Sequence, residues 1–115
     1  MTEQVKGEPY KRITCLDAHK FYGDKNSHFI DVRNDDEYKS GHIPGSIHIP
    51  VDKFLQSIDQ LPKDGNLYFI CAAGARSGLA CEFSASFSIE ESRLFNVYEG
   101  MPTWINNGLP VEKGK

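Results

Sequence analysis

The feature that most constrains the fold is an alternation of short apolar runs with segments of helical periodicity. Four runs rich in aromatic and β-branched residues have the composition of buried strands, at residues 28–32, 46–49, 67–71 and 94–98. Between the strands, apolar residues recur at steps of three and four, in one set of Val51, Phe54, Leu55, Ile58 and Leu61 and in another of Leu79, Phe83 and Phe87. Each set predicts one apolar helix face. The alternation predicts an α/β fold, with a parallel or mostly parallel sheet covered on both faces.

Two further helices are indicated by residues that favour helix N-termini. Asn34 precedes three acidic residues that would face the positive end of a helix dipole, and Gly41 is a natural stop. Thr14 with Asp17 opens an earlier helix in the same way. In parallel sheets of this kind, functional sites lie beyond the carboxyl ends of strands, where loops lead into helices. Cys71 stands at such an end.

Length and composition are those of one folded domain over residues 1–115, with short flexible tails expected at about 1–8 and 111–115. Seven Phe, five Tyr and one Trp can supply its core. The net charge is −3 and the basic residues are scattered, so neither nucleic acid nor an anionic membrane is indicated as a partner. The N-terminus lacks an apolar signal segment and no run has the length of a bilayer span, so a cytoplasmic location is expected. Three cysteines, an odd number, favour reduced thiols over a disulfide framework.

The segment NLYFICAAGARSGLAC joins a strand to a helix through a loop of very small residues. Ala72, Ala73 and Ala75 leave the backbone uncrowded, and Gly74 can take a positive φ, so backbone N–H groups could converge on the sulfur of Cys71. These donors, the helix N-terminus and the guanidinium of Arg76 would all favour a thiolate. The segment therefore predicts a cysteine nucleophile, with residues 72–76 binding the charge that develops on its substrate.

Other interpretations of Cys71 explain less of the pattern. A lone cysteine at a strand end is usually a small core residue, but packing alone requires neither the glycine nor the arginine. A Walker phosphate loop would end in Gly-Lys followed by Ser or Thr, which is absent here. A thioredoxin-type redox site would need a second cysteine at the position of Gly74.

With these residues identified, the chain resembles a single-domain member of the rhodanese-like sulfurtransferase family from about Ile13 to Leu109. ICAAGARS resembles the active-site loop of that family, with Cys71 as the sulfur carrier and Arg76 closing the loop. FIDVRNDDEYKSGHIPGSIHIP resembles a second family motif and VYEGMPTW a third, in the family's order. The second motif places four residues in supporting roles: Asp31, Arg33, Glu37 and His42. The resemblance implies a rhodanese-like sheet of about five strands.

The same resemblance implies thiosulfate:cyanide sulfurtransferase chemistry through a Cys71 persulfide. The expected partners are a small sulfur-containing anion or a protein persulfide as donor and a thiol or cyanide as acceptor, with no cofactor and no metal. A sulfur-carrier or protein-interaction module with little small-molecule turnover is the alternative. A phosphatase or arsenate reductase is less favoured, because relatives of that kind have one more residue between cysteine and arginine than the four found here.

The sequence departs from the family pattern at three places. Glu99 replaces the first glycine of a pair, so the resemblance does not determine the backbone conformation at this position. Ala72 stands where many thiosulfate-using members carry a basic residue, so the loop has one cation. The stretch SIEESR before the last strand is longer than usual and is expected to be a surface loop.

Several other residues have ordinary structural interpretations. His42 is expected to be held by hydrogen bonds, and Trp104 to be a core anchor. Asp31, Arg33 and Glu37 could form an ion-pair network beneath the loop. Cys15 is interpreted as a helix-start or core thiol. Cys81 lies off the Leu79, Phe83 and Phe87 set and is expected to be partly exposed.

Overall fold

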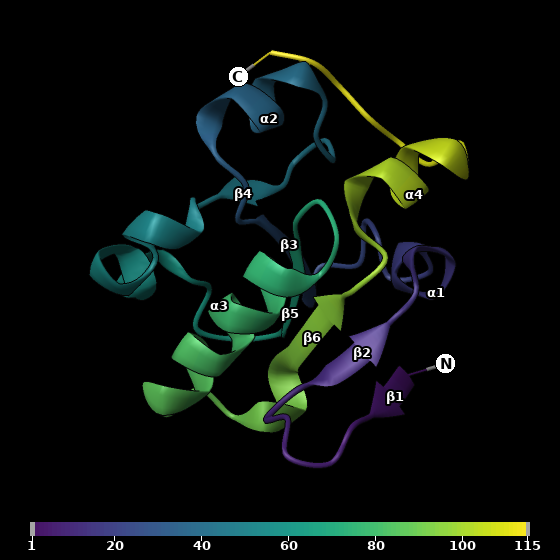
Figure 1. Ribbon diagram of the computed structural model, residues 1–115. Helices are drawn as coiled ribbons and strands as arrows, with labels where there is room; N and C mark the ends of the chain where they lie inside the picture. Colours follow the sequence, from purple (N-terminus) through teal and green to yellow (C-terminus); the bar gives the residue numbers. More distant parts are fainter. Residues whose placement is uncertain (1, 115) are drawn as a thin grey trace.

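The computed structural model describes residues 2–114 and has one mixed sheet flanked by helices (Figure 1). The strands are β1 Thr2–Gln4, β2 Lys11–Ile13, β3 Ser27–Asp31, β4 Ile47–His48, β5 Asn66–Ile70 and β6 Leu94–Val97. Their order across the sheet is β1-β2-β6-β5-β3-β4, and only β1 runs antiparallel to its neighbour. The α/β class with a mostly parallel sheet is therefore confirmed.

The sheet has six strands, not about five. The additional strands lie in the N-terminal part, and β1 falls inside the segment expected to be a flexible tail. Near the other end, His42 and Glu112 exchange backbone hydrogen bonds of 2.9 Å in both directions, so part of segment 111–115 also pairs with the domain.

Helices of two kinds cover the sheet. The α-helices are α1 Cys15–His19, α2 Asp35–Ser40, α3 Ala75–Ser86 and α4 Gly100–Asn106. The 3₁₀ helices are η1 Val51–Lys53, η2 Leu55–Gln60 and η3 Glu91–Arg93. The expected helix over the set from Val51 to Leu61 is thus two 3₁₀ segments. Phe54 between them and Leu61 after the second are buried, but Leu55 is 47% exposed.

Each face of the sheet has its own apolar core. On one side Phe54, Phe69, Ala80 and Cys81 belong to a cluster of residues from η1, η2, α3 and the central strands. On the other side α1 and α4 contribute Ala18 and Trp104 to a second cluster that also contains Tyr68. The view in Figure 1 shows α3 in front of β5, with α1 and α4 grouped to the right of β6.

The buried face of α3 is not the one that its large apolar residues predicted. Its buried residues are small: Ser77, Gly78, Ala80, Cys81 and Ser84. A Cβ at Gly78 would lie 3.0 Å from the hydroxyl of Tyr10, so the helix packs too closely for bulky side chains there. Leu79 and Phe87 are consequently 41% and 54% exposed.

The helix starts indicated by the sequence are confirmed. Thr14 accepts a hydrogen bond from the Asp17 N–H at 3.2 Å and caps α1. Asn34 and Glu37 form a reciprocal capping box at the start of α2, and Gly41 is the C-cap.

Candidate active site

Two glycines of positive φ hold the loop after β5 in place. Gly74 precedes α3 with φ +94°, and a Cβ there would lie 2.6 Å from the Tyr98 carbonyl oxygen. Gly100 has φ +81°, and a Cβ there would overlap the carbonyl oxygen of Ala72. The Met101 N–H also donates to the Cys71 carbonyl at 2.8 Å. The turn between β6 and α4 therefore supports the cysteine loop, at positions where only glycine fits without strain.

The sulfur of Cys71 lies among hydrogen-bond donors at the start of α3. The Gly74 N–H donates to Sγ at 3.1 Å, and the Ser77 hydroxyl lies 3.4 Å from Sγ. Burial raises the pKa of the Cys71 thiol, but hydrogen bonds from the Ser77 side chain and from the backbone of Ser77, Ala73 and Gly74 lower it. The lowering prevails, so the pKa lies below its ordinary value. Cys71 is only 1% exposed, although its surroundings favour a charge.

Ser77 and Asn96 belong to this arrangement and were not identified from the sequence. The Ser77 hydroxyl donates to Asn96 Oδ1 at 2.6 Å, and Asn96 Nδ2 donates to the Gly74 carbonyl at 3.1 Å. Asn96 thus links β6 to Gly74 in the cysteine loop and to Ser77 in the first turn of α3. A thiolate at Cys71 would compete with Asn96 for the single hydroxyl proton of Ser77. A polar residue inside the apolar run 94–98 was the available signal, since a buried amide needs partners.

Arg76 is paired with Glu37. Its Nη1 and Nη2 donate to the two carboxylate oxygens of Glu37 at 2.6 and 2.9 Å, in a bidentate arrangement. Hydrogen bonds from Arg76 lower the pKa of Glu37 to about 2, and the same hydrogen bonds raise the pKa of Arg76. Both groups are therefore charged at neutral pH, and their charges offset each other beside the loop.

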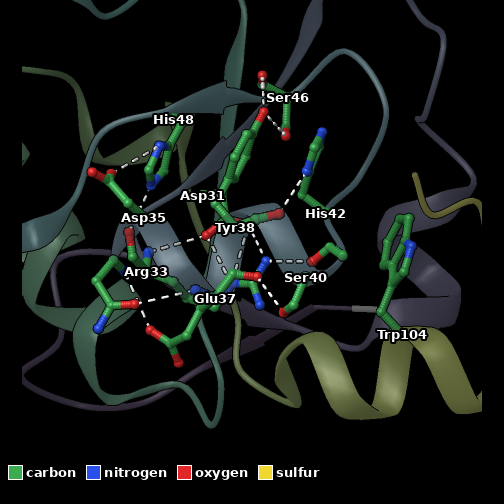
Figure 2. Close-up of polar contacts among 12 residues, drawn as sticks. Asp31, Arg33, Asp35, Glu37, Tyr38, Ser40, His42, Ser46, His48 and Trp104 are labelled. Atoms are coloured by element: carbon green, nitrogen blue, oxygen red, sulfur yellow. Dashed lines mark hydrogen bonds and ion pairs between the residues drawn. The ribbon is translucent and has the colours of Figure 1, made fainter. Parts of the chain in front are cut away.

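Asp31, at the end of β3, and Arg33 form a separate pair (Figure 2). Arg33 Nη2 donates to Asp31 Oδ2 at 2.7 Å and to the Gly41 carbonyl at 2.7 Å, and Arg33 Nε also donates to Asp31. Both residues are buried. The single network expected of Asp31, Arg33 and Glu37 is instead two hydrogen-bonded pairs, because Glu37 turns toward Arg76 on α3.

His42 is buried with both ring nitrogens engaged. Nδ1 lies 2.7 Å from the Tyr38 carbonyl oxygen, and Nε2 lies 3.2 Å from Glu112 Oε2. Its ring stacks on Tyr38, whose ring also stacks on His48, with centroids 3.7 and 4.1 Å apart. Figure 2 shows the Tyr38 ring between the two imidazoles. This stack and its hydrogen bonds hold α2 against the segment that leads to β4.

Glu99 has an ordinary backbone and a specific role. Its φ of −71° requires no glycine, and its carboxylate accepts the Cys15 N–H at 2.8 Å. The side chain thereby binds the N-terminus of α1.

Trp104 is fully buried and donates its indole N–H to the Pro110 carbonyl at 2.8 Å. In the extended connection after Ser88, Arg93 donates to the carbonyls of Gly65 and Pro62.

The other two cysteines differ chemically from Cys71. Cys15 begins α1 and is buried, and burial raises its pKa to about 12. Cys81 is also fully buried, which corrects the expectation of partial exposure, and burial raises its pKa as well. Close packing of the small-residue face of α3 against the sheet explains its position.

Residues 2–114 contain no group of three or more His, Cys, Asp or Glu side chains arranged to hold a metal ion. Within the same residues, no helix is both long and apolar enough to cross a bilayer.

Known proteins resemble this chain in both sequence and fold. The family profile of the Rhodanese-like domain matches residues 14–107. The chain belongs to the rhodanese-like domain family. Its relatives include Bacillus subtilis YtwF, a candidate sulfurtransferase, which is 33% identical over 97 residues, covering 84% of this chain and 91% of YtwF. A candidate sulfur carrier, YrkF from Bacillus subtilis, is 32% identical over 85 residues, covering 74% of this chain but 45% of YrkF.

Solved structures share the fold. The crystal structure of a rhodanese-related protein from Thermoplasma volcanium superposes with a TM-score of 0.77 at 31% identity. The superposition covers 88% of this chain and 96% of that protein. The rhodanese-like fold is thus confirmed, with Cys71 at the end of β5 in the segment that resembles the family's active-site loop.

Proposed function

We propose that this protein is a sulfurtransferase in which Cys71 carries a sulfane sulfur as a persulfide. The observation that carries the proposal is the environment of Sγ, which accepts the Gly74 N–H at 3.1 Å at the start of a 12-residue helix. Such donors stabilise a thiolate and, after loading, the charge on a persulfide. Cys71 would be the catalytic residue, and residues 72–76 the substrate-binding loop.

The reaction proceeds in two displacements. The Cys71 thiolate attacks the sulfane sulfur of a donor such as thiosulfate, the new S–S bond forms, the donor's S–S bond breaks, and sulfite leaves. Cyanide or a thiol then attacks the outer sulfur, and the Cys71 thiolate is the leaving group. This is ping-pong nucleophilic catalysis without an added cofactor. Asp31, Arg33, Glu37 and His42 would support the loop.

Intact-mass analysis tests the proposal. Incubation with thiosulfate or inorganic polysulfide is expected to add the mass of one sulfur atom at Cys71, and subsequent cyanide is expected to remove it as thiocyanate. A Cys71→Ser variant should show neither adduct nor transfer. A Cys81→Ser variant is the matched control and should retain both. An adduct that persists in Cys71→Ser would contradict the assignment.

A sulfur carrier with little small-molecule turnover is the second candidate, and two observations favour it. Arg76, the cation of the loop, is paired with Glu37 through two hydrogen bonds. Ala72 adds no second cation. A small anion such as thiosulfate therefore gains little attraction at the loop, whereas a persulfide on another molecule would not require it. Slow loading by thiosulfate together with fast loading by polysulfide would favour the carrier.

A further inference from the structure

Within residues 2–114, the molecular surface beside the cysteine loop offers no unpaired arginine. Arg76 is bound by Glu37, as described above. Arg12 lines the hollow next to Ala73 and Ala75, and its Nη2 lies 2.7 Å from the carboxylate of Glu8. Pairing offsets the positive charge of both arginines, so neither favours small anions over other substrates.

An apolar groove begins at the same place. Its lining includes Val51, Leu55, Leu79 and Phe83, and its volume is about 420 Å³. Leu79 also lines the hollow of about 580 Å³ that contains Ala73, Gly74 and Ala75, so the two depressions share a wall. Leu55 and Leu79 are 47% and 41% exposed, which leaves apolar surface in contact with water next to the loop.

Carboxylates border this groove. Asp52 lines it and also lines a neighbouring hollow with Asp35 and Asp36, while Glu82 lines the loop hollow with Leu79. Lys53 also lines the hollow that contains Asp35 and Asp36. Asp35 contacts His48 at 3.9 Å. Four carboxylates outweigh Lys53, and the charge of Arg12 in the loop hollow is offset by Glu8, so the surroundings of the groove are negative.

We propose that this groove docks a protein thiol acceptor through an apolar side chain flanked by lysine or arginine close to the reactive cysteine. The apolar side chain would fill the space between Leu55 and Leu79. The basic residues would lie against Asp36 and Asp52, which would speed encounter and set orientation. The proposal rests on the proposed function, because it names the acceptor of the Cys71 persulfide.

The transfer step balances without an oxidant or reductant. The acceptor sulfur attacks the outer sulfur of the Cys71 persulfide anion, and a new S–S bond forms. The old S–S bond breaks, the acceptor thiol proton passes to the new persulfide, and Cys71 is released as thiolate. The sulfane sulfur keeps its oxidation state throughout.

The test uses the full chain, loaded with inorganic polysulfide, and three synthetic cysteine peptides of equal length. One carries leucine and lysines around the cysteine, one carries leucine and glutamates, and one carries alanine and lysines. Transfer rates are measured by mass spectrometry at low and high salt, with cyanide as the reference acceptor. The first peptide is expected to react about tenfold faster than the second at low salt, with a smaller difference at high salt. It should also react faster than the third.

Variants of the groove residues test whether the peptide preferences arise at the groove. Asp36→Lys combined with Asp52→Lys is expected to remove the preference for lysine, and Leu55→Ser to remove the preference for leucine. Glu90→Lys and Ile105→Ser are matched controls, because Glu90 is exposed away from the groove and Ile105 is 47% exposed on α4. The melting temperature of each variant confirms that it is folded.

The outcomes separate this inference from the proposed function. Equal rates for the lysine and glutamate peptides, with normal transfer to cyanide, would overturn the docking groove and leave the sulfurtransferase intact. Preferences that survive the groove variants would also overturn it. Failure of transfer to every acceptor would overturn both.

Discussion

Cys71 and Cys81 lie ten residues apart in the sequence, and both are buried, at 1% and 0% exposure. Burial raises the pKa of Cys81, and the nearby carboxylates of Glu82 and Glu8 raise it further. Burial acts on Cys71 in the same direction, but hydrogen bonds from the loop and Ser77 reverse the result. The comparison teaches that two equally buried thiols of this protein have pKa values shifted in opposite directions. The difference comes from polar donors that the loop aims at one sulfur.

The largest effect is expected from moving the loop itself. Gly74→Ala places a Cβ where the Tyr98 carbonyl oxygen lies 2.6 Å away and forces a positive φ on alanine. We expect the N–H donor to shift from Cys71 and sulfur transfer to fall by on the order of tenfold to a hundredfold. Gly108→Ala is the matched control, because Gly108 also has a positive φ, of +72°, but open space around it. Equal transfer rates in the two variants would contradict a specific role of Gly74 in holding the loop. Both variants force a positive φ on alanine, so backbone strain alone would then explain the result.

A smaller effect is expected from the Ser77 hydroxyl. Ser77→Ala removes a hydrogen-bonding partner of the Cys71 sulfur, so the pKa of Cys71 should rise and its alkylation at neutral pH should slow roughly three- to tenfold. Ser84→Ala is the control on the same helix, since the Ser84 hydroxyl is buried and donates to the Ala80 carbonyl instead. An unchanged pH profile in Ser77→Ala would assign Ser77 to packing alone.

The smallest effect is expected from the ion pair of Glu37 and Arg76, which lies outside the immediate surroundings of the Cys71 sulfur. The pKa of Glu37 is lowered to about 2, so its pairing with Arg76 stabilises the fold above about pH 4.5 and this contribution is lost as pH falls toward 2. Because a third of each side chain is exposed, we expect no more than about 1 kcal/mol. Thermal unfolding of wild type and Glu37→Gln measures it. The difference in melting temperature should shrink as pH falls, and a constant difference would contradict the pairing.

Much of the fold could be predicted because short apolar runs rich in aromatic and β-branched residues mark the central strands. β1 and β2 could not, since all three residues of β1 are exposed and β2 has two partly exposed basic residues in three positions. Steps of three and four fit 3₁₀ as well as α-helices, so the pattern from Val51 to Leu61 did not distinguish them. On α3, large apolar residues suggested the buried face, but close packing selects small ones there.

The candidate site was partly predictable for a related reason. Cys71, Gly74 and Arg76 lie within six consecutive residues, from the end of β5 to the first turn of α3, so local sequence carries their arrangement. The partner of Arg76 is Glu37, 39 positions away, and several carboxylates were equally available in the sequence. Ser77 and Asn96 meet only because β6 lies beside β5. Contacts across the sheet are decided by tertiary structure, which spacing alone does not encode.

The most direct measurement compares the two cysteines in single-thiol proteins. Cys71 is retained in a Cys15→Ser, Cys81→Ser background, and Cys81 in a Cys15→Ser, Cys71→Ser background. The rate of alkylation by iodoacetamide is followed against pH. Cys71 should stay reactive well below the pH at which a free cysteine slows, and Cys81 should react only on unfolding. A Cys71 that follows an ordinary thiol, or that resists alkylation until the protein unfolds, would contradict an activated site at the end of β5.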